Sequence, residues 1–219
     1  MKYLKEFDNE ADVQVFVQPN VVLANDTGNV LYNVEPMRGV FIQHINGKLY
    51  TTTQWRESGF ANDLANGVAV CDEEASFVMA LKKYSGVAWS SDTTTLVEGV
   101  TTTEDSTTAR ADYDGKKNTD AIIKTDTSGA AYLCANYVFP NGQKGYLPAL
   151  GEWMVVNRYN SAISSAFSLL GTYFQGTGYG KSSTQKNATE NWVYGFALGV
   201  TTYGSKDVAS YAYPFTTLQ

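Results

Sequence analysis

A helical segment lies between two regions of strand-like sequence, and this order restricts the fold more than any other feature. The segment begins at Pro148, a residue suited to the first turn of a helix, and Glu152 follows in the turn where the helix dipole favours an acid. Apolar residues then recur at helical spacing: Trp153, Val156, Tyr159 and Ile163. Because strands, helices and strands follow one another in blocks, the sequence predicts an α+β fold.

The first strand region covers residues 39–81. Residues 39–45 (GVFIQHI) and 48–55 (KLYTTTQW) are rich in β-branched and aromatic residues, and Asn46-Gly47 between them is typical of a hairpin turn. Residues 75–81 (ASFVMAL) are expected to form a further strand, although the composition of the surrounding residues also fits a helix. This region is therefore predicted to be mostly sheet.

Residues 90–115 are polar and rich in Thr, and they are expected to form an exposed excursion or a solvated edge strand. Asn118 is then expected to cap a helix over residues 119–124. Residues 130–139 predict another helix, with Leu133, Tyr137 and Val138 along one face. Residues 191–204 and 208–215 are the last predicted strands.

Residues 1–38 are predicted to be a separate small module. Asp8 can cap a brief helix, and residues 21–23 and 30–32 can pair as a hairpin across the turn at 25–28. Such a unit has too little core to be stable alone, so it should rest on the main domain, a second copy or a larger partner. The apolar residues proposed to make this attachment are Tyr3, Leu4, Phe7, Phe16, Val22 and Leu31. Residues 39–219 form the second domain.

Charge and hydropathy exclude two classes of partner. The net charge is −6 and no more than two Lys or Arg residues are adjacent, so the basic surface that nucleic-acid binding requires is missing. No window approaches the roughly 18 apolar residues of a membrane span, so membrane insertion is not expected. The start of the sequence lacks an uninterrupted apolar leader, which favours synthesis in the cytoplasm unless a leader precedes it.

The two cysteines are expected to be free. Cys71 and Cys134 each follow an apolar run and belong to no metal-binding spacing. Cysteine is among the most buried residue types, so a buried thiol is favoured over a disulfide.

The sequence contains no recognisable catalytic or metal site. His44 is the single histidine and lies in a predicted strand, where an ordinary structural role is favoured over catalysis. The carboxylates at 72–74 could bind a cation, but a solvated corner is favoured. Residues 112–115 (DYDG) resemble the start of a calcium loop whose pattern then breaks. No catalytic residue, metal or cofactor is therefore assigned, and the chain is expected not to be an enzyme.

Aromatic residues gather near the end of the chain, mixed with small polar residues. Rigid aromatic rings beside Ser, Asn and Gly are typical of recognition surfaces, although on strands about half of them would face a core. The predicted ligand surface consists of Tyr179, Lys181, Trp192, Tyr194, Tyr203, Tyr211 and Tyr213.

Three segments carry a resemblance to a known family: residues 112–119 (DYDGKKNT), residues 129–153 (ending in GYLPALGEW) and residues 182–185 (SSTQ) followed by NWVYGF. They resemble the C-type-lectin-like domains of the major-paralogous-domain and retroelement variable-protein type. The resemblance implies a domain of mixed short strands with two helices over about residues 39–215. The calcium-dependent sugar-binding signature of lectins is missing from this region, so calcium-dependent binding is not implied.

The first 38 residues are similar to an N-terminal module on virion proteins of phages that infect gut Bacteroidales, crAss-like phages among them. This resemblance implies a virion protein made in the host cytoplasm: a head fibre, capsid decoration or adhesion protein. The module would contact capsid or other virion proteins, the chain would form a homotrimer, and the lectin-like domain would face a glycan or protein of the host surface. The alternative is a bacterial or retroelement-diversified adhesin outside any virion.

Overall fold

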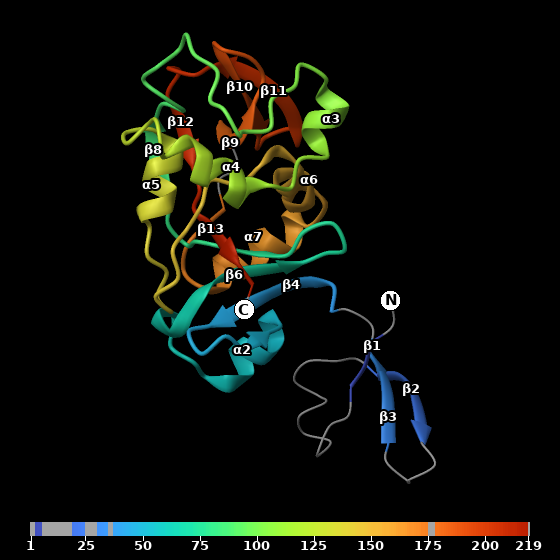
Figure 1. Ribbon diagram of the computed structural model, residues 1–219. Coiled ribbons are helices and arrows are strands. Elements are labelled where there is room, and N and C mark those ends of the chain that lie inside the picture. Colours follow the sequence, from blue (N-terminus) through green and yellow to red (C-terminus); the bar gives the residue numbers. More distant parts are fainter. Residues whose placement is uncertain (1–2, 6–18, 25–29, 35–36, 175–177, 219) are drawn as a thin grey trace.

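The computed structural model describes residues 3–5, 19–24, 30–34, 37–174 and 178–218 (Figure 1). The fold is mixed α+β, as predicted, with six α-helices among these residues. Three sheets are present, one near the N-terminus and two formed by residues 39–217, the part of the chain called the main domain below.

The N-terminal sheet has the order β1-β3-β2 and is antiparallel. The predicted hairpin is confirmed, since Val22 of β2 pairs with Tyr32 of β3. Phe7, Phe16 and the predicted short helix after Asp8 lie outside the described residues. The strands are β1 (Tyr3–Lys5), β2 (Pro19–Ala24) and β3 (Val30–Val34).

The first sheet of the main domain is entirely antiparallel, in the order β13-β7-β6-β4-β5. It contains the predicted strand at 39–45 and the strand in residues 75–81, where the helical alternative is wrong. It also contains the last strand of the chain, so the two ends of the domain meet in one sheet. The strands are β4 (Gly39–His44), β5 (Leu49–Tyr50), β6 (Ala65–Cys71), β7 (Phe77–Met79) and β13 (Phe215–Thr217).

The second sheet has the order β11-β10-β9-β12-β8. Strands β9 and β12 are parallel and the other pairs are antiparallel. The strands are β8 (Tyr84–Val87), β9 (Tyr179–Gln185), β10 (Glu190–Gly195), β11 (Val200–Ser205) and β12 (Ser210–Ala212).

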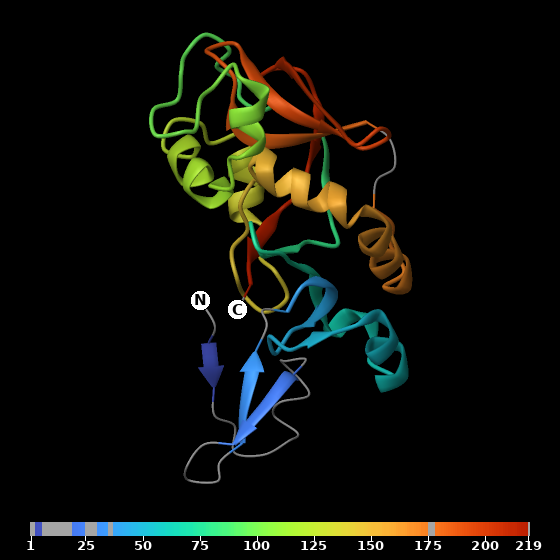
Figure 2. The same ribbon diagram turned by 90° about the vertical axis from the view of Figure 1, so that its right-hand side faces the viewer.

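Helices α6 (Leu150–Arg158) and α7 (Asn160–Leu169) lie between the two sheets (Figure 2). Trp153 of α6 is fully buried and contacts rings from both sheets, with its ring centroid 5.4 Å from that of Tyr194 and 5.3 Å from that of Phe215. Its indole Nε1 donates to the backbone oxygen of Lys181 at 3.0 Å. Removing so large a buried ring costs about 3–5 kcal/mol, so this residue joins the layers of the core. The predicted helix after Pro148 is confirmed, but Tyr159 divides it in two.

Several predicted elements differ from those of the structure. Residues 48–55 do not return as one strand, because β5 ends at Tyr50 and helix α2 (Thr52–Ser58) begins. The Thr51 hydroxyl accepts from the Gln54 amide and the Gln54 side chain accepts from the Thr51 amide, which is a capping box. A short 3₁₀ turn (Asn62–Leu64) follows α2.

The polar region at 90–115 contains no strand among its described residues. It is an excursion with mostly exposed residues from 91 to 99, as expected, and then forms helix α3 (Ser106–Arg110).

Asn118 does not cap the next helix, because α4 (Gly115–Ile122) starts earlier and encloses it. Helix α5 (Ala130–Asn136) buries Ala130, Ala131 and Cys134 instead of the predicted face through Leu133, Tyr137 and Val138. Both Cys71 and Cys134 are free and buried, as predicted.

Candidate functional site

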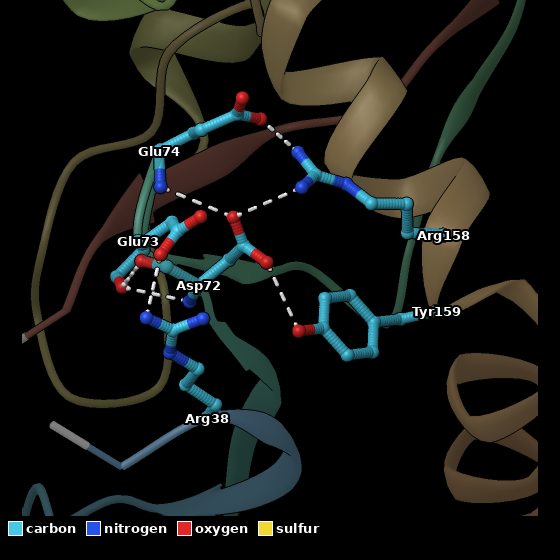
Figure 3. Close-up of polar contacts among 7 residues, drawn as sticks. Arg38, Asp72, Glu73, Glu74, Arg158 and Tyr159 are labelled. Atoms are coloured by element: carbon cyan, nitrogen blue, oxygen red, sulfur yellow. Dashed lines mark hydrogen bonds and ion pairs between the residues drawn. The ribbon is translucent and has the colours of Figure 1, made fainter. Parts of the chain in front are cut away.

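The acidic corner at residues 72–74, after β6, is held by side chains of the protein itself (Figure 3). Arg158, the last residue of α6, lies with Nη1 3.5 Å from Oδ1 of Asp72 and also pairs with Glu74. The Tyr159 hydroxyl donates to Oδ2 of Asp72 at 2.9 Å. The corner therefore ties the turn between β6 and β7 to the junction of the two central helices.

A second arginine completes the corner. Arg38, just before β4, lies with Nη2 2.5 Å from Oε2 of Glu73, and both side chains are more than half exposed. Arginine charges therefore occupy the positions that a bound cation would take. Within the described part of the chain no group of three or more metal-ligating side chains is found.

Glu152 has a buried carboxyl group at the start of α6. Its Oε2 accepts from the Ala149 amide at 2.7 Å, and its Oε1 accepts from the Tyr146 hydroxyl at 2.6 Å. A Cβ atom added to Gly115 would lie 2.1 Å from Oε2, so only glycine fits beneath it. Burial raises the pKa of Glu152 to about 8, although both hydrogen bonds act in the opposite direction. The group caps α6 from the first helical turn, where the sequence places an acid, and its Oε2 lies against Gly115 of α4.

A surface hollow of about 430 Å³ lies beside this carboxylate. The lysines on its wall are already paired, Lys116 with Asp120 at 2.8 Å and Lys117 with Asp114 at 3.1 Å. The hollow therefore presents paired surface charges over a capped helix, and the Glu152 carboxyl group at its base is hydrogen-bonded to the Tyr146 hydroxyl and the Ala149 amide.

Asp112 is the centre of a buried polar network. Its Oδ2 accepts from Nδ2 of Asn118 at 2.8 Å and from the Thr184 hydroxyl at 2.7 Å. Its Oδ1 accepts from the Thr101 hydroxyl at 3.2 Å and from the Asp114 amide at 3.0 Å. Protein donors reach both oxygens, so Asp112 joins α4, β9 and the polar excursion.

His44 lies in an aromatic cluster at the end of β4. Its Nδ1 accepts from the Asn46 amide at 3.1 Å, and its ring centroid lies 5.1 Å from that of Phe60 and 6.1 Å from that of Trp55. These neighbours offer packing and a turn contact. These contacts support the structural role that the sequence favours for His44.

Four of the seven residues predicted as a ligand surface are buried. Lys181, Trp192, Tyr194 and Tyr213 are at most 4% exposed. Tyr194 of β10 and Tyr213, which follows β12, both contact Trp153 of α6 in the core. The prediction of one continuous surface is therefore wrong for these four.

The three remaining tyrosines do not form one group. Tyr203 is half exposed on edge strand β11, where Nζ of Lys186 lies 3.9 Å from its ring centroid. Tyr179 is also half exposed, and its ring lies against Gly195. Tyr211 is half-buried on β12 and pairs with Gly180, so it lies on the opposite face of the sheet from Tyr179.

Tyr211 belongs to a cluster of three residues, of which the predicted ligand surface contained Tyr211 alone. The Lys83 cluster consists of Lys83, before β8, together with Tyr173, after α7, and Tyr211. Nζ of Lys83 lies 5.1 Å from the ring centroid of Tyr173 and 4.8 Å from that of Tyr211. Tyr173 is 70% exposed, which makes it the most exposed aromatic side chain of the described residues.

The Lys83 cluster has the chemistry of a small recognition surface. The tyrosine rings offer flat apolar faces, their hydroxyls can donate or accept, and the ammonium is a donor held close to the rings. Burial lowers the pKa of Lys83. Tyr173 belongs to the aromatic-rich end of the sequence, but no spacing pattern connects it with Lys83, which is 90 positions earlier.

Comparison with known proteins places the fold but not the family. No family model matches the chain, and no curated protein matches its sequence. Among solved structures, the chain is similar to a fimbrial protein from Bacteroides ovatus, with a TM-score of 0.61 and 13% sequence identity. The alignment covers 82% of this chain and 48% of that one, so this chain spans about half of the fimbrial protein's length. The two proteins share a fold over that region.

Proposed function

We propose that this protein is a non-enzymatic recognition protein whose main domain is of the C-type-lectin-like type. The observation that carries the proposal is the Lys83 cluster, with the 70% exposed ring of Tyr173 beside an ammonium. Exposed tyrosines next to a positively charged donor suit the flat faces and hydroxyls of a surface glycan or the side chains of a surface protein.

The titratable groups of the domain support binding over catalysis. Glu152 caps a helix, Asp112 joins three segments, and Asp72 pairs with an arginine. Each has a structural partner in the positions where a general acid or base would need a substrate. No cofactor is proposed.

We further propose that the main domain faces outward from a bacteriophage virion. The N-terminal sheet would attach the chain to capsid or other virion proteins as a head fibre or decoration, and a homotrimer is the proposed assembly. Support comes from the resemblance of the first 38 residues and from the small size of their three-stranded sheet, which offers little core of its own. Nucleic acid is not a proposed partner, and no helix of the described residues is long and apolar enough to cross a membrane.

The alternative is an adhesin of a bacterial surface. The fold shared with a protein described as fimbrial favours it. Immunogold labelling of purified phage particles and of uninfected Bacteroidales cells distinguishes the two. We expect label on particles; label only on cells would contradict the virion proposal and support the adhesin.

Binding is tested separately from location. The purified full chain should bind Bacteroidales cells or their surface polysaccharides equally well in calcium and in a calcium chelator. Loss of binding in the chelator would contradict the calcium-independent site proposed here, and failure to bind any cell or polysaccharide would contradict recognition itself.

A further inference from the structure

The second sheet buries a lysine and an asparagine against each other on neighbouring strands. Lys181 of β9 is 1% exposed and Asn191 of β10 is fully buried. Nζ of Lys181 lies 3.2 Å from Oδ1 of Asn191. The strand register shifts between Asn191 and Val193, which brings the two side chains together although their backbones are not directly paired.

The side-chain amide of Asn191 is held in a fixed orientation. Its Nδ2 donates to the backbone oxygen of Trp192 at 2.8 Å, which leaves Oδ1 to accept from Nζ of Lys181 and keeps the amide carbonyl beside the amine. This arrangement fits an amine placed beside a carbonyl that it can attack, because proximity and orientation replace an encounter in solution.

We propose that Lys181 and Asn191 become joined by an intramolecular isopeptide bond between β9 and β10. The neutral amine Nζ attacks Cγ of Asn191 and forms the new C–N bond. The bond between Cγ and Nδ2 breaks, a proton passes from Nζ to Nδ2, and ammonia leaves. No atom is oxidised or reduced, and no other reactant is required.

The surroundings of Lys181 favour this reaction. Burial lowers the pKa of Lys181 to about 8, while the nearby charge of Asp207 acts in the opposite direction. A desolvated lysine with a lowered pKa is a better nucleophile at neutral pH, since more of it is unprotonated.

The second buried lysine of the same sheet is a natural control. Nζ of Lys206 donates to the backbone oxygen of Thr95 at 2.8 Å and to Oε1 of Gln185 at 2.9 Å, and it lies 4.9 Å from the ring centroid of Trp89. These contacts stabilise the ammonium, while burial lowers the pKa of Lys206 as it does that of Lys181. Lys206 is therefore expected to stay unreacted even though it too lies beside a side-chain amide.

The mass of the purified full chain tests the proposal. We expect it to be lighter than the sequence mass by one ammonia molecule. A mass equal to that of the sequence would overturn the proposal. Because cyclisation at Asn46-Gly47, Asn66-Gly67 or Asn141-Gly142 would also release ammonia, the position of the loss must be mapped.

A tryptic digest of the denatured protein gives that position. An acylated Lys181 resists trypsin, so residues 159–186 should appear joined to residues 187–206 as one branched species. Separate unmodified peptides 159–181, 182–186 and 187–206 would contradict the bond, whatever the intact mass. The wild-type digest decides this even if a variant fails to fold.

Two variants complete the test. Lys181→Met should restore the full sequence mass, and Lys206→Met should keep the loss of one ammonia molecule. A loss that persists in Lys181→Met, or that disappears in Lys206→Met, would overturn the assignment to this pair.

Discussion

Asp112 shows how one buried side chain can fix several distant segments. Four donors converge on its two oxygens, from Thr101, Asp114, Asn118 and Thr184, and its side chain is almost fully buried. A carboxylate can accept all four because it offers acceptors only. The DYDG motif that begins at Asp112 is visible in the sequence. Its hydrogen-bond donors could not be predicted, since they come from separate segments of the chain.

Replacing Asp112 by Asn should therefore destabilise the domain. The new amide NH₂ would face hydrogen-bond donors, which leaves buried groups unsatisfied at a cost of about 1–3 kcal/mol. Urea unfolding measures this loss. Asp114→Asn is the matched control, because its carboxylate is more than half exposed and pairs only with a surface lysine; equal losses in the two variants would contradict the network.

Glu152 gives the protein a pH dependence of stability. Its pKa is about 8 in the folded state against an ordinary value of 4.5, so between these values the folded state keeps a proton that the unfolded state has lost. The free energy of unfolding should then fall as pH rises through this range, by up to about 1.4 kcal/mol per pH unit, and level off above it.

Urea unfolding of the wild type and of Glu152→Gln at several pH values checks this dependence. The variant has no proton to lose at this position, so its stability should fall less steeply between pH values of about 4.5 and 8. The comparison uses slopes and is independent of any constant loss caused by the substitution. Parallel curves would show that Glu152 is already ionised in the folded protein.

At the scale of elements, local capping explains why some helices and strands differ from the sequence prediction. The Thr-rich residues 51–53 have high strand propensity, yet the capping box of Thr51 and Gln54 begins a helix there, and Gly59 ends it with a φ of 68°. The same competition explains Asn118, whose capping side chain is instead used inside α4 to contact Asp112. Strands with clear alternation and turns, such as β4 and its Asn46-Gly47 turn, were predictable.

The capping box makes a direct prediction for α2. Thr51→Ala should reduce the free energy of unfolding by about 1 kcal/mol, because the Gln54 amide loses its acceptor. Thr53 lies two residues further along, at an exposed position inside α2. Thr53→Ala should cost less, since alanine is the better helix former there. Thermal or urea unfolding of both variants separates the cap from the general effect of losing a threonine.

At the scale of the whole molecule, the α+β class followed from the order of strand and helix patterns. The position of the candidate site did not follow from these patterns. A period of two in a strand indicates that alternate residues face opposite sides, but it does not say which side is the core. Tyr194 faces Trp153, whereas Tyr179, which pairs with the next residue, Gly195, lies on the other face and is half exposed. Only the packing of α6 between the sheets resolves that choice.

The most direct test compares two exposed tyrosines, Tyr173 in the segment after α7 and Tyr203 on strand β11. Tyr173 belongs to the Lys83 cluster, which contains Tyr211 of β12, while Tyr203 lies on β11, about 14 Å away by strand spacing. Both Tyr173 and Tyr203 are at least half exposed and lie near a lysine ammonium. Their replacement by alanine should therefore disturb the fold equally little.

The measurement is the equilibrium binding of the full chain to Bacteroidales cells, with the wild type, Tyr173→Ala and Tyr203→Ala compared at equal foldedness by circular dichroism. We expect Tyr173→Ala to weaken binding by about tenfold or more, the effect of losing a central aromatic contact, and Tyr203→Ala to leave it unchanged. Unchanged binding in Tyr173→Ala, or equal loss in both variants, would contradict the Lys83 cluster as the recognition surface.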